Sequence, residues 1–95
     1  MTNLLESTKR IHFEMEMQGI DPDMKLFAEF APAFLGFATR GSSSEPVAAY
    51  DYDKCSGVLQ DRDGMTEEEA LEFLEYNYVN SWLGDGTPFF VKIAS

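Results

Sequence analysis

The 95-residue sequence has few of the residues on which most metal and redox sites depend. It contains one cysteine and one histidine, which excludes an intrachain disulfide, a zinc site of several cysteines and a site with two histidines. The aspartate-rich segments lack the glycine and glutamate spacing of an EF-hand calcium loop. Glycine-rich phosphate loops of the Walker and Rossmann types are absent as well. We therefore expect no metal and no cofactor.

Basic residues are also scarce, because seven Lys and Arg stand against seventeen Asp and Glu, giving a net charge of −10. Such a balance repels phosphate groups, so we expect no direct binding to nucleic acid or to an anionic membrane. No apolar run approaches the roughly 20 residues of a membrane span, and the first residues lack the apolar core of a signal peptide. With a single cysteine, these features predict a cytoplasmic protein.

Apolar residues are plentiful, at 44% of the chain, and they include eight Phe, four Tyr and one Trp. This content is far above that of a disordered acidic tail and is sufficient for a packed core. The length suits one domain, over residues 1–95, and not two. The single cysteine, Cys55, is predicted to face inward as an inert thiol.

The first 20 residues fit two structures. Asn3 and Glu6 have the spacing of a helix cap, which would begin an amphipathic helix. Every second residue over 11–17 is apolar, however, and this alternation favours a half-buried strand. We predict a short helical turn over residues 4–9, followed by a strand that ends at Gly19.

The next segment predicts a short helix and a hairpin. Asp21 and Pro22 are a helix cap and a first helical residue, and Pro32 ends this predicted helix. The apolar runs 33–40 and 47–50 are predicted to form two strands joined by a flexible loop.

Two helices and a strand complete the chain. Asp51 caps a helix that ends near Gln60, and a capping box that begins at Thr66 starts a second helix that runs to about Leu83. Alternating apolar residues over 89–93 predict the last strand. The expected fold is an α+β domain in which a small antiparallel sheet of three to four strands carries the helices on one face.

The negative charge is concentrated in the two predicted helices. Residues 45–75 contain ten acidic and two basic residues, so a net −8 of the total −10 lies in this segment. A surface of that density costs stability through self-repulsion. Binding a basic protein, imitating nucleic-acid phosphates and simple solubility are three explanations. The candidate partner-binding residues are the outward carboxylates Asp61, Asp63, Glu67, Glu68, Glu72 and Glu75.

Two alternatives belong to other functional classes. A small-ligand protein or enzyme would use polar side chains near the predicted strand ends: Arg40, Tyr50, Asp51 and Lys54. A homo-oligomer would form through the open edge of the predicted strand over residues 11–17. We favour a binding protein over an enzyme and assign no catalytic residue.

Several short motifs occur together in the second half of the chain. They are AYDYDKC (49–55), RDGMTEEEA (62–70), EYN (75–77) and TPFF (87–90), preceded by Ala33, Gly36 and Arg40. Together they resemble a family of small proteins found mainly in bacteriophage genomes and their prophages. The resemblance covers about residues 33–92, within a family-like core over 31–95, and makes residues 1–30 an N-terminal extension. It implies a phage-type accessory protein but no catalytic residues, since the family has no assigned activity.

The acidity and the resemblance together lead to one functional hypothesis. The protein would bind a host protein with a basic surface, in the host cytoplasm, and modulate it through the acidic helices. An anti-defence inhibitor, either anti-CRISPR-like or nucleic-acid-mimicking, is the most specific form of this hypothesis.

Overall fold

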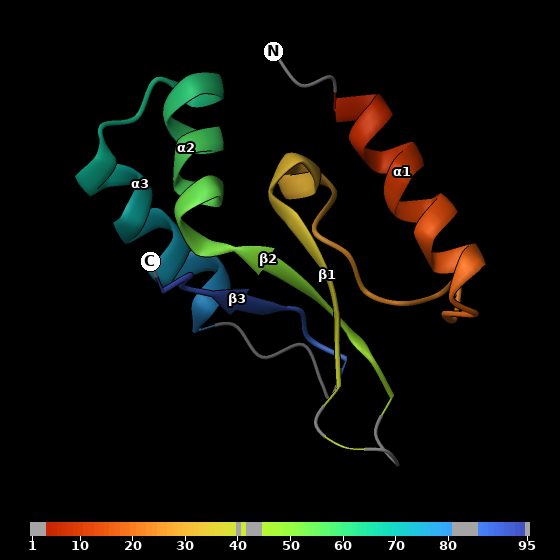
Figure 1. Ribbon diagram of the computed structural model, residues 1–95. Coiled ribbons are helices and arrows are strands. Elements are labelled where there is room, and N and C mark those ends of the chain that lie inside the picture. The colour runs from red at the N-terminus through yellow and green to blue at the C-terminus, as the bar shows by residue number, and fades with distance from the viewer. Residues whose placement is uncertain (1–3, 40, 42–44, 81–85, 95) are drawn as a thin grey trace.

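The structure, a computed structural model, describes residues 4–39, 41, 45–80 and 86–94. Its elements are α1 (Leu4–Met17), the 3-10 helix η1 (Ala28–Ala33), β1 (Phe34–Ala38), β2 (Val47–Asp51), α2 (Tyr52–Asp63), α3 (Glu67–Leu74), the π-helix η2 (Glu75–Val79) and β3 (Phe89–Val91). Figure 1 shows α1 at one end of the molecule and α2 with α3 at the other, with η1 between them. The predicted α+β class is confirmed.

The three strands form one sheet in the order β1-β2-β3. β1 and β2 make the predicted antiparallel hairpin, with Phe34 opposite Tyr50 and Ala38 opposite Val47. β3 pairs with β2 in parallel, so the sheet is mixed and the prediction of an antiparallel sheet needs correction. β3 runs parallel to β2 because of the connection between them. α2 and α3 lie between the two strands in the chain, and this long crossover returns the chain to the end of the sheet where β2 begins.

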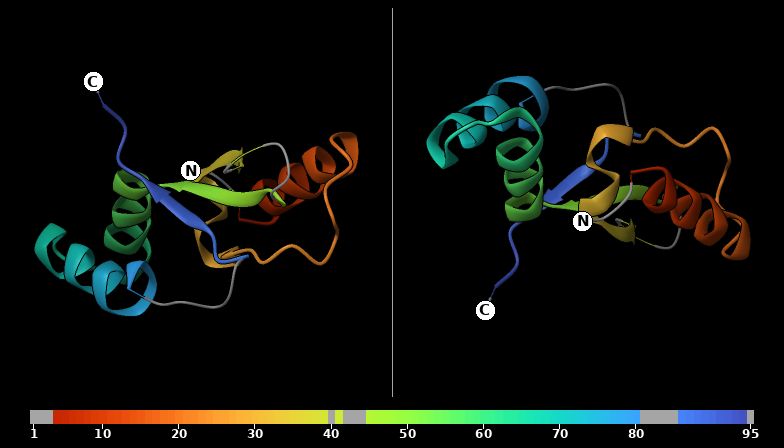
Figure 2. Two further views of the ribbon diagram at one scale, coloured as in Figure 1. Left: turned by 90° about the horizontal axis from the view of Figure 1, so that it is seen from below. Right: turned by 90° about the horizontal axis from the view of Figure 1, so that it is seen from above.

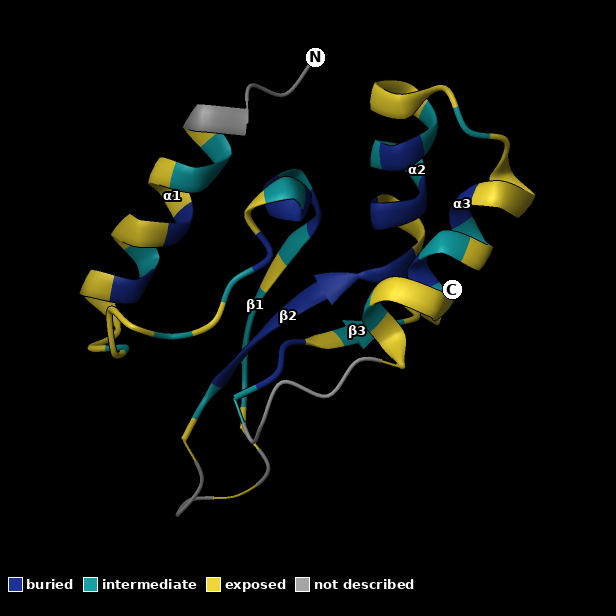
Figure 3. Ribbon diagram, turned by 180° about the vertical axis from the view of Figure 1, so that it is seen from behind, coloured by how far each residue is buried: buried dark blue, intermediate teal, exposed yellow. Residues whose placement is uncertain are grey.

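The helices pack on one face of the sheet, as predicted. Phe34 and Phe37 of β1 lie opposite Tyr50 and Ala48 of β2, so their side chains share a face. The ring centroids of Phe34 and Tyr50 are 5.7 Å apart, which agrees with this placement. Tyr50 and Ala48 belong to a buried cluster with α2 and α3, whereas Phe34 and Phe37 also pack against buried residues of α1. In Figure 3, the buried residues of α1 lie on the side of the helix that faces η1, and its exposed residues lie on the outer side.

α1 is one continuous helix, so the predicted strand at the N-terminus is wrong. Every second residue of an α-helix is rotated by about 200°, so a period-two apolar pattern falls on two opposite sides. Ile11 and Met15 lie on the buried side, at 4% and 3% exposure, and Phe13 and Met17 lie on the other side, at 57% and 68%. The strand edge suggested for homo-oligomerisation over 11–17 is therefore absent from this segment.

The helix predicted to begin at Asp21 is also corrected. The Asp21 side chain accepts a hydrogen bond from the backbone N–H of Asp23 at 2.8 Å, which closes a local turn in place of a helix cap. The helical segment begins later, at Ala28, and it contains Pro32, the residue expected to end it. Phe30 leaves the helical conformation (φ −110°, ψ 20°), so η1 is a pair of tight turns that accommodates proline.

Aromatic rings dominate the larger buried cluster. Phe27, Phe30, Tyr50, Tyr78 and Phe90 pack with ring centroids between 4.9 and 6.5 Å apart, in tilted, stacked and edge-on arrangements. Phe30 and Tyr50 are completely buried. The Tyr50 hydroxyl accepts a hydrogen bond from the backbone N–H of Phe27 at 2.9 Å, which satisfies this polar group in the core. These rings join η1, β2, η2 and β3 into one packed unit.

Candidate functional site

The α2–α3 hairpin, meaning residues 52–74 with the turn between the helices, contains seven acidic and two basic residues. Asp51 is the predicted cap of α2, and its Oδ1 accepts a hydrogen bond from the backbone N–H of Lys54 at 3.1 Å. Gly64 ends the helix in the left-handed conformation (φ 68°) and donates its N–H to the carbonyl of Gln60 at 3.1 Å. Both ends of α2 are therefore fixed by local hydrogen bonds.

α3 begins with the capping box that the sequence predicts. Thr66 Oγ1 accepts a hydrogen bond from the backbone N–H of Glu69 at 3.2 Å, and Glu69 Oε1 accepts one from the backbone N–H of Thr66 at 2.9 Å. Three glutamates occupy the first turn, where negative charge complements the helix dipole. The helix continues as η2 to Val79, and its predicted end at Leu83 lies outside the described residues.

The apolar sides of both helices point into the core and orient the carboxylates outward. Cys55 and Leu59 of α2, with Ala70 and Leu74 of α3, are at most 1% exposed. All six predicted partner-binding residues lie on α2, α3 or the first residue of η2. Five of them are exposed, namely Asp61, Asp63, Glu67, Glu68 and Glu72, and Glu75 is half-buried.

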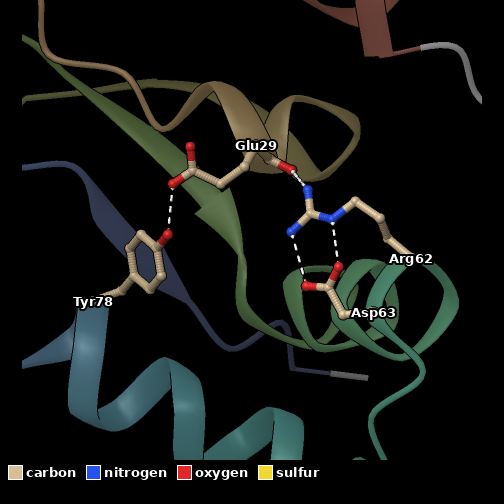
Figure 4. Close-up of polar contacts among 4 residues, drawn as sticks. All are labelled: Glu29, Arg62, Asp63 and Tyr78. Atoms are coloured by element: carbon tan, nitrogen blue, oxygen red, sulfur yellow. Dashed lines mark hydrogen bonds and ion pairs between the residues drawn. The ribbon is translucent and has the colours of Figure 1, made fainter.

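Asp63 is held by a neighbouring cation (Figure 4). Arg62 donates from Nε and Nη2 to the two carboxylate oxygens of Asp63, at 3.2 and 3.3 Å. Arg62 Nη1 also donates to the backbone carbonyl of Glu29 at 3.0 Å. The Glu29 carboxylate accepts a hydrogen bond from the Tyr78 hydroxyl at 2.7 Å. This network ties the end of α2 to η1 and η2, and it offsets the charge of Asp63.

Glu75 is likewise engaged inside the molecule. The Tyr52 hydroxyl donates to Glu75 Oε1 at 2.9 Å. Burial, and after it this hydrogen bond, raises the pKa of Tyr52, because a phenolate beside a carboxylate is disfavoured. Burial and the bond to Glu29 raise the pKa of Tyr78 to about 12 in the same way. Both hydroxyls therefore remain protonated donors at neutral pH.

The carboxylates best placed to meet a partner are thus a subset of the predicted ones. Asp61, Glu67, Glu68 and Glu72 are exposed and lie outside the bonds just described. Glu68 and Glu72 are one helical turn apart on α3, so their side chains point from the same face. Tyr76, one turn further on, is 85% exposed and is not among the residues predicted from the sequence. Its exposure could have been predicted from the sequence, because Tyr76 is four residues, about one helical turn, after Glu72, which is predicted to face outward.

The alternative ligand site is only partly assembled. An open depression of about 520 Å³ beside α2 is lined by eight residues: Pro32, Asp51, Asp53, Lys54, Gly57, Val58, Asp61 and Ile93. Tyr50 does not line it, because its side chain is completely buried in the core. This burial also raises the pKa of Tyr50 to about 12. Asp51 is 9% exposed and serves as the helix cap, whereas Lys54 is exposed. Arg40 lies outside the described residues.

Other chemical roles find little support in the described part of the chain. Cys55 is completely buried, and burial, with the charge of Asp51 after it, raises its pKa to about 12, so its thiol stays neutral. No group of three His, Cys, Asp or Glu side chains among the described residues is arranged to hold a metal ion. In the same residues, every helix is too short or too polar to cross a membrane.

In comparisons with protein-family models, curated proteins and solved structures, nothing matched the chain. The resemblance to a phage family therefore stays a prediction from motifs. The structure does show what these motifs build here. Residues 49–55 form the end of β2 and the cap of α2, residues 62–70 form the turn and the capping box, and residues 87–90 lead into β3. The motifs thus lie where one element of the fold ends and the next begins.

Proposed function

We propose that this protein is a phage-type accessory protein that binds a basic surface of a host protein through the α2–α3 hairpin and thereby modulates that protein. One observation carries the proposal. Exposed carboxylates, Asp61, Glu67, Glu68 and Glu72, are held on two capped helices whose opposite sides are anchored in the core. The helices that carry these charges are therefore held in place by the core.

The placement of these carboxylates disfavours the fold itself. Like charges four residues apart on a helix, as at Glu68 and Glu72, destabilise it by roughly 0.2–0.5 kcal/mol per pair. Residues 45–75 also hold a net −8, ten acids and two bases, in one part of a small domain. A basic partner would remove this repulsion on binding. It would also be attracted over a distance of about 8–10 Å at physiological salt.

The most specific form of the proposal is an anti-defence inhibitor acting in the host cytoplasm. Grooves that hold nucleic acid are lined with Lys and Arg, which replace the counterions of the phosphates. A rigid row of carboxylates can occupy such a groove by the same electrostatic means. An anti-CRISPR-like protein of this type would compete with nucleic acid for its target and would not bind nucleic acid itself.

A double charge reversal on α3 tests the proposal. Glu68→Lys with Glu72→Lys changes the exposed face, and Glu75 is left intact because it accepts the Tyr52 hydrogen bond. The matched control is Asp23→Lys with Glu45→Lys, which makes the same change in net charge at exposed positions outside the hairpin. Each protein is used as bait in a host lysate, and the captured proteins are identified by mass spectrometry.

We expect the wild-type protein and the control to capture one and the same protein with a basic surface. The α3 variant should bind that protein at least about tenfold more weakly, a loss of roughly 1.4 kcal/mol. Equal capture by all three proteins, or no specific capture by the wild type, would overturn the proposal. The inhibitor form is tested separately, by asking whether the captured protein loses its nucleic acid as the accessory protein is added.

A further inference from the structure

α1 carries an apolar surface that faces away from the rest of the molecule. Phe13 and Met17 are one helical turn apart and are 57% and 68% exposed. Ile11 and Met15, on the opposite side, already supply the contacts that hold α1 to the core. Figures 1 and 3 show α1 at the periphery, with its outer side exposed. The Phe13–Met17 stripe therefore contributes little to the folded monomer.

The charges around this stripe are arranged in a complementary way. At about 100° per residue, Lys9 and Glu16 fall on the same flank of the stripe, one turn before and one turn after Phe13. Both side chains are exposed. If a second α1 packs antiparallel to the first with the two Phe13 side chains at the centre, Lys9 of each copy lies level with Glu16 of the other. A parallel arrangement would instead bring like charges to the same level.

The charge distribution of the whole molecule favours contact at this end. α1 contains three acidic and two basic residues, a net −1, whereas residues 45–75 carry −8. The molecule is elongated, with extents of 39 × 27 × 27 Å, and both views in Figure 2 place α1 and the α2–α3 hairpin at opposite ends. Two copies joined through α1 would keep their acidic hairpins far apart, beyond the roughly 8–10 Å over which charges act at physiological salt.

We propose that the protein forms a twofold-symmetric dimer through antiparallel α1 helices, with Phe13 and Met17 at the centre and two Lys9–Glu16 ion pairs at the flank. One pair of 14-residue helices covers less than the roughly 1,200–2,000 Å² of a stable interface. The dimer is therefore weak and depends on protein concentration. The dimer presents two acidic hairpins at its outer ends. The inference of a dimer does not rest on the function proposed above.

Sedimentation equilibrium on the full chain over a roughly hundredfold range of concentration tests this dimer. The wild-type mass should rise toward that of two copies. Phe13→Gln with Met17→Gln should remain a monomer throughout, because it removes the apolar centre without touching the buried side of α1. Leu35→Thr, at an exposed apolar position of β1 (45%), is the matched control and should dimerise like the wild type. A wild type that stays monomeric, or a dimer lost only in the Leu35 variant, would overturn the proposal.

Charge exchange tests the antiparallel register. Lys9→Glu alone and Glu16→Lys alone should each weaken the dimer several-fold, because each places like charges together at two symmetric positions. The double variant Lys9→Glu with Glu16→Lys should return to near the wild-type dissociation constant, since both pairs are restored with reversed sign. Failure of the double variant to recover would reject this pairing. Circular dichroism of each variant at low concentration verifies that α1 remains helical.

Discussion

The α2–α3 hairpin and α1 pack on the same face of one sheet, but they differ in what they leave exposed. The hairpin turns its apolar residues inward, and its exposed surface is dominated by carboxylates. α1 divides its apolar residues between two sides and keeps nearly balanced charge. One region is thus suited to meet a basic partner and the other to meet an apolar one. The net acidity of the chain therefore describes only one of its two ends.

The two regions also differ in how firmly they are anchored. Among the residues whose burial the structure describes, the cluster around the hairpin contains ten buried residues and the cluster beneath α1 contains three. The hairpin is further tied to η1 by Arg62, which donates to the carbonyl of Glu29. We therefore expect the hairpin side to hold most of the stability of the fold.

Truncation of a buried side chain in each region should give the largest contrast. Leu74→Ala removes a completely buried side chain from the hairpin cluster and should lower the free energy of unfolding by about 2–5 kcal/mol. Met15→Ala, at 3% exposure beneath α1, should cost less, because the smaller cluster lies at the periphery and can close around the cavity. Urea unfolding measures both. Equal losses would show that the two regions are anchored alike.

Alkaline pH should lower the free energy of unfolding through Tyr50, which lies in the buried cluster on the hairpin side. Burial raises the pKa of Tyr50 from 10.0 to about 12, so the fold favours the neutral hydroxyl. The neutral Tyr50 hydroxyl therefore contributes fully to the free energy of unfolding below pH 10, and this contribution is lost as the pH rises from 10 to 12. A shift of this size corresponds to about 3 kcal/mol. Stability should therefore fall steeply over this range, as urea titrations at a series of pH values would measure.

Tyr50→Phe separates this titration from the packing of the ring. The variant leaves the Phe27 N–H without its acceptor, which should cost about 1–3 kcal/mol at neutral pH. Between pH 10 and 12, however, it should lose about 3 kcal/mol less than the wild type, so the two stability curves converge. Parallel curves would show that Tyr50 does not titrate in the unfolding reaction. Cys55 and Tyr78, whose pKa values burial also raises to about 12, are present in both proteins and contribute to both curves.

The features that could be predicted from the sequence are those made by residues close together in the chain. Asp51 caps α2 through a residue three positions away, and the β1–β2 hairpin joins neighbouring strands. Thr66 and Glu69 are likewise three residues apart. Such contacts depend on local spacing alone, so the sequence predicts both helix caps and the five exposed carboxylates, whereas Glu75, predicted to face outward, is half-buried and bonded to Tyr52.

The features that the sequence does not predict depend on contacts between distant residues or on an apolar pattern that fits both a strand and a helix. The direction of β3 depends on the path through two helices, and the bond between Glu29 and Tyr78 joins residues 49 positions apart. The pattern over 11–17 fits a strand and a two-sided helix equally well. Only packing against Ala31 and Phe37 decides between them, and no local pattern records that packing.

Removal of the α3 cap should give the smallest of these effects and the most local one. Thr66→Ala deletes the oxygen that accepts the Glu69 N–H and should lower the free energy of unfolding by about 1 kcal/mol. Thr66→Ser keeps that oxygen and should retain most of the stability. Since the first turn of α3 carries Glu67 and Glu68, the alanine variant should also weaken binding to a basic partner, beyond its effect on stability. Hydrogen exchange would localise the change, with faster exchange in the first turn of α3 and unchanged exchange in α1. Faster exchange in both helices would mean that the two ends of the molecule unfold together.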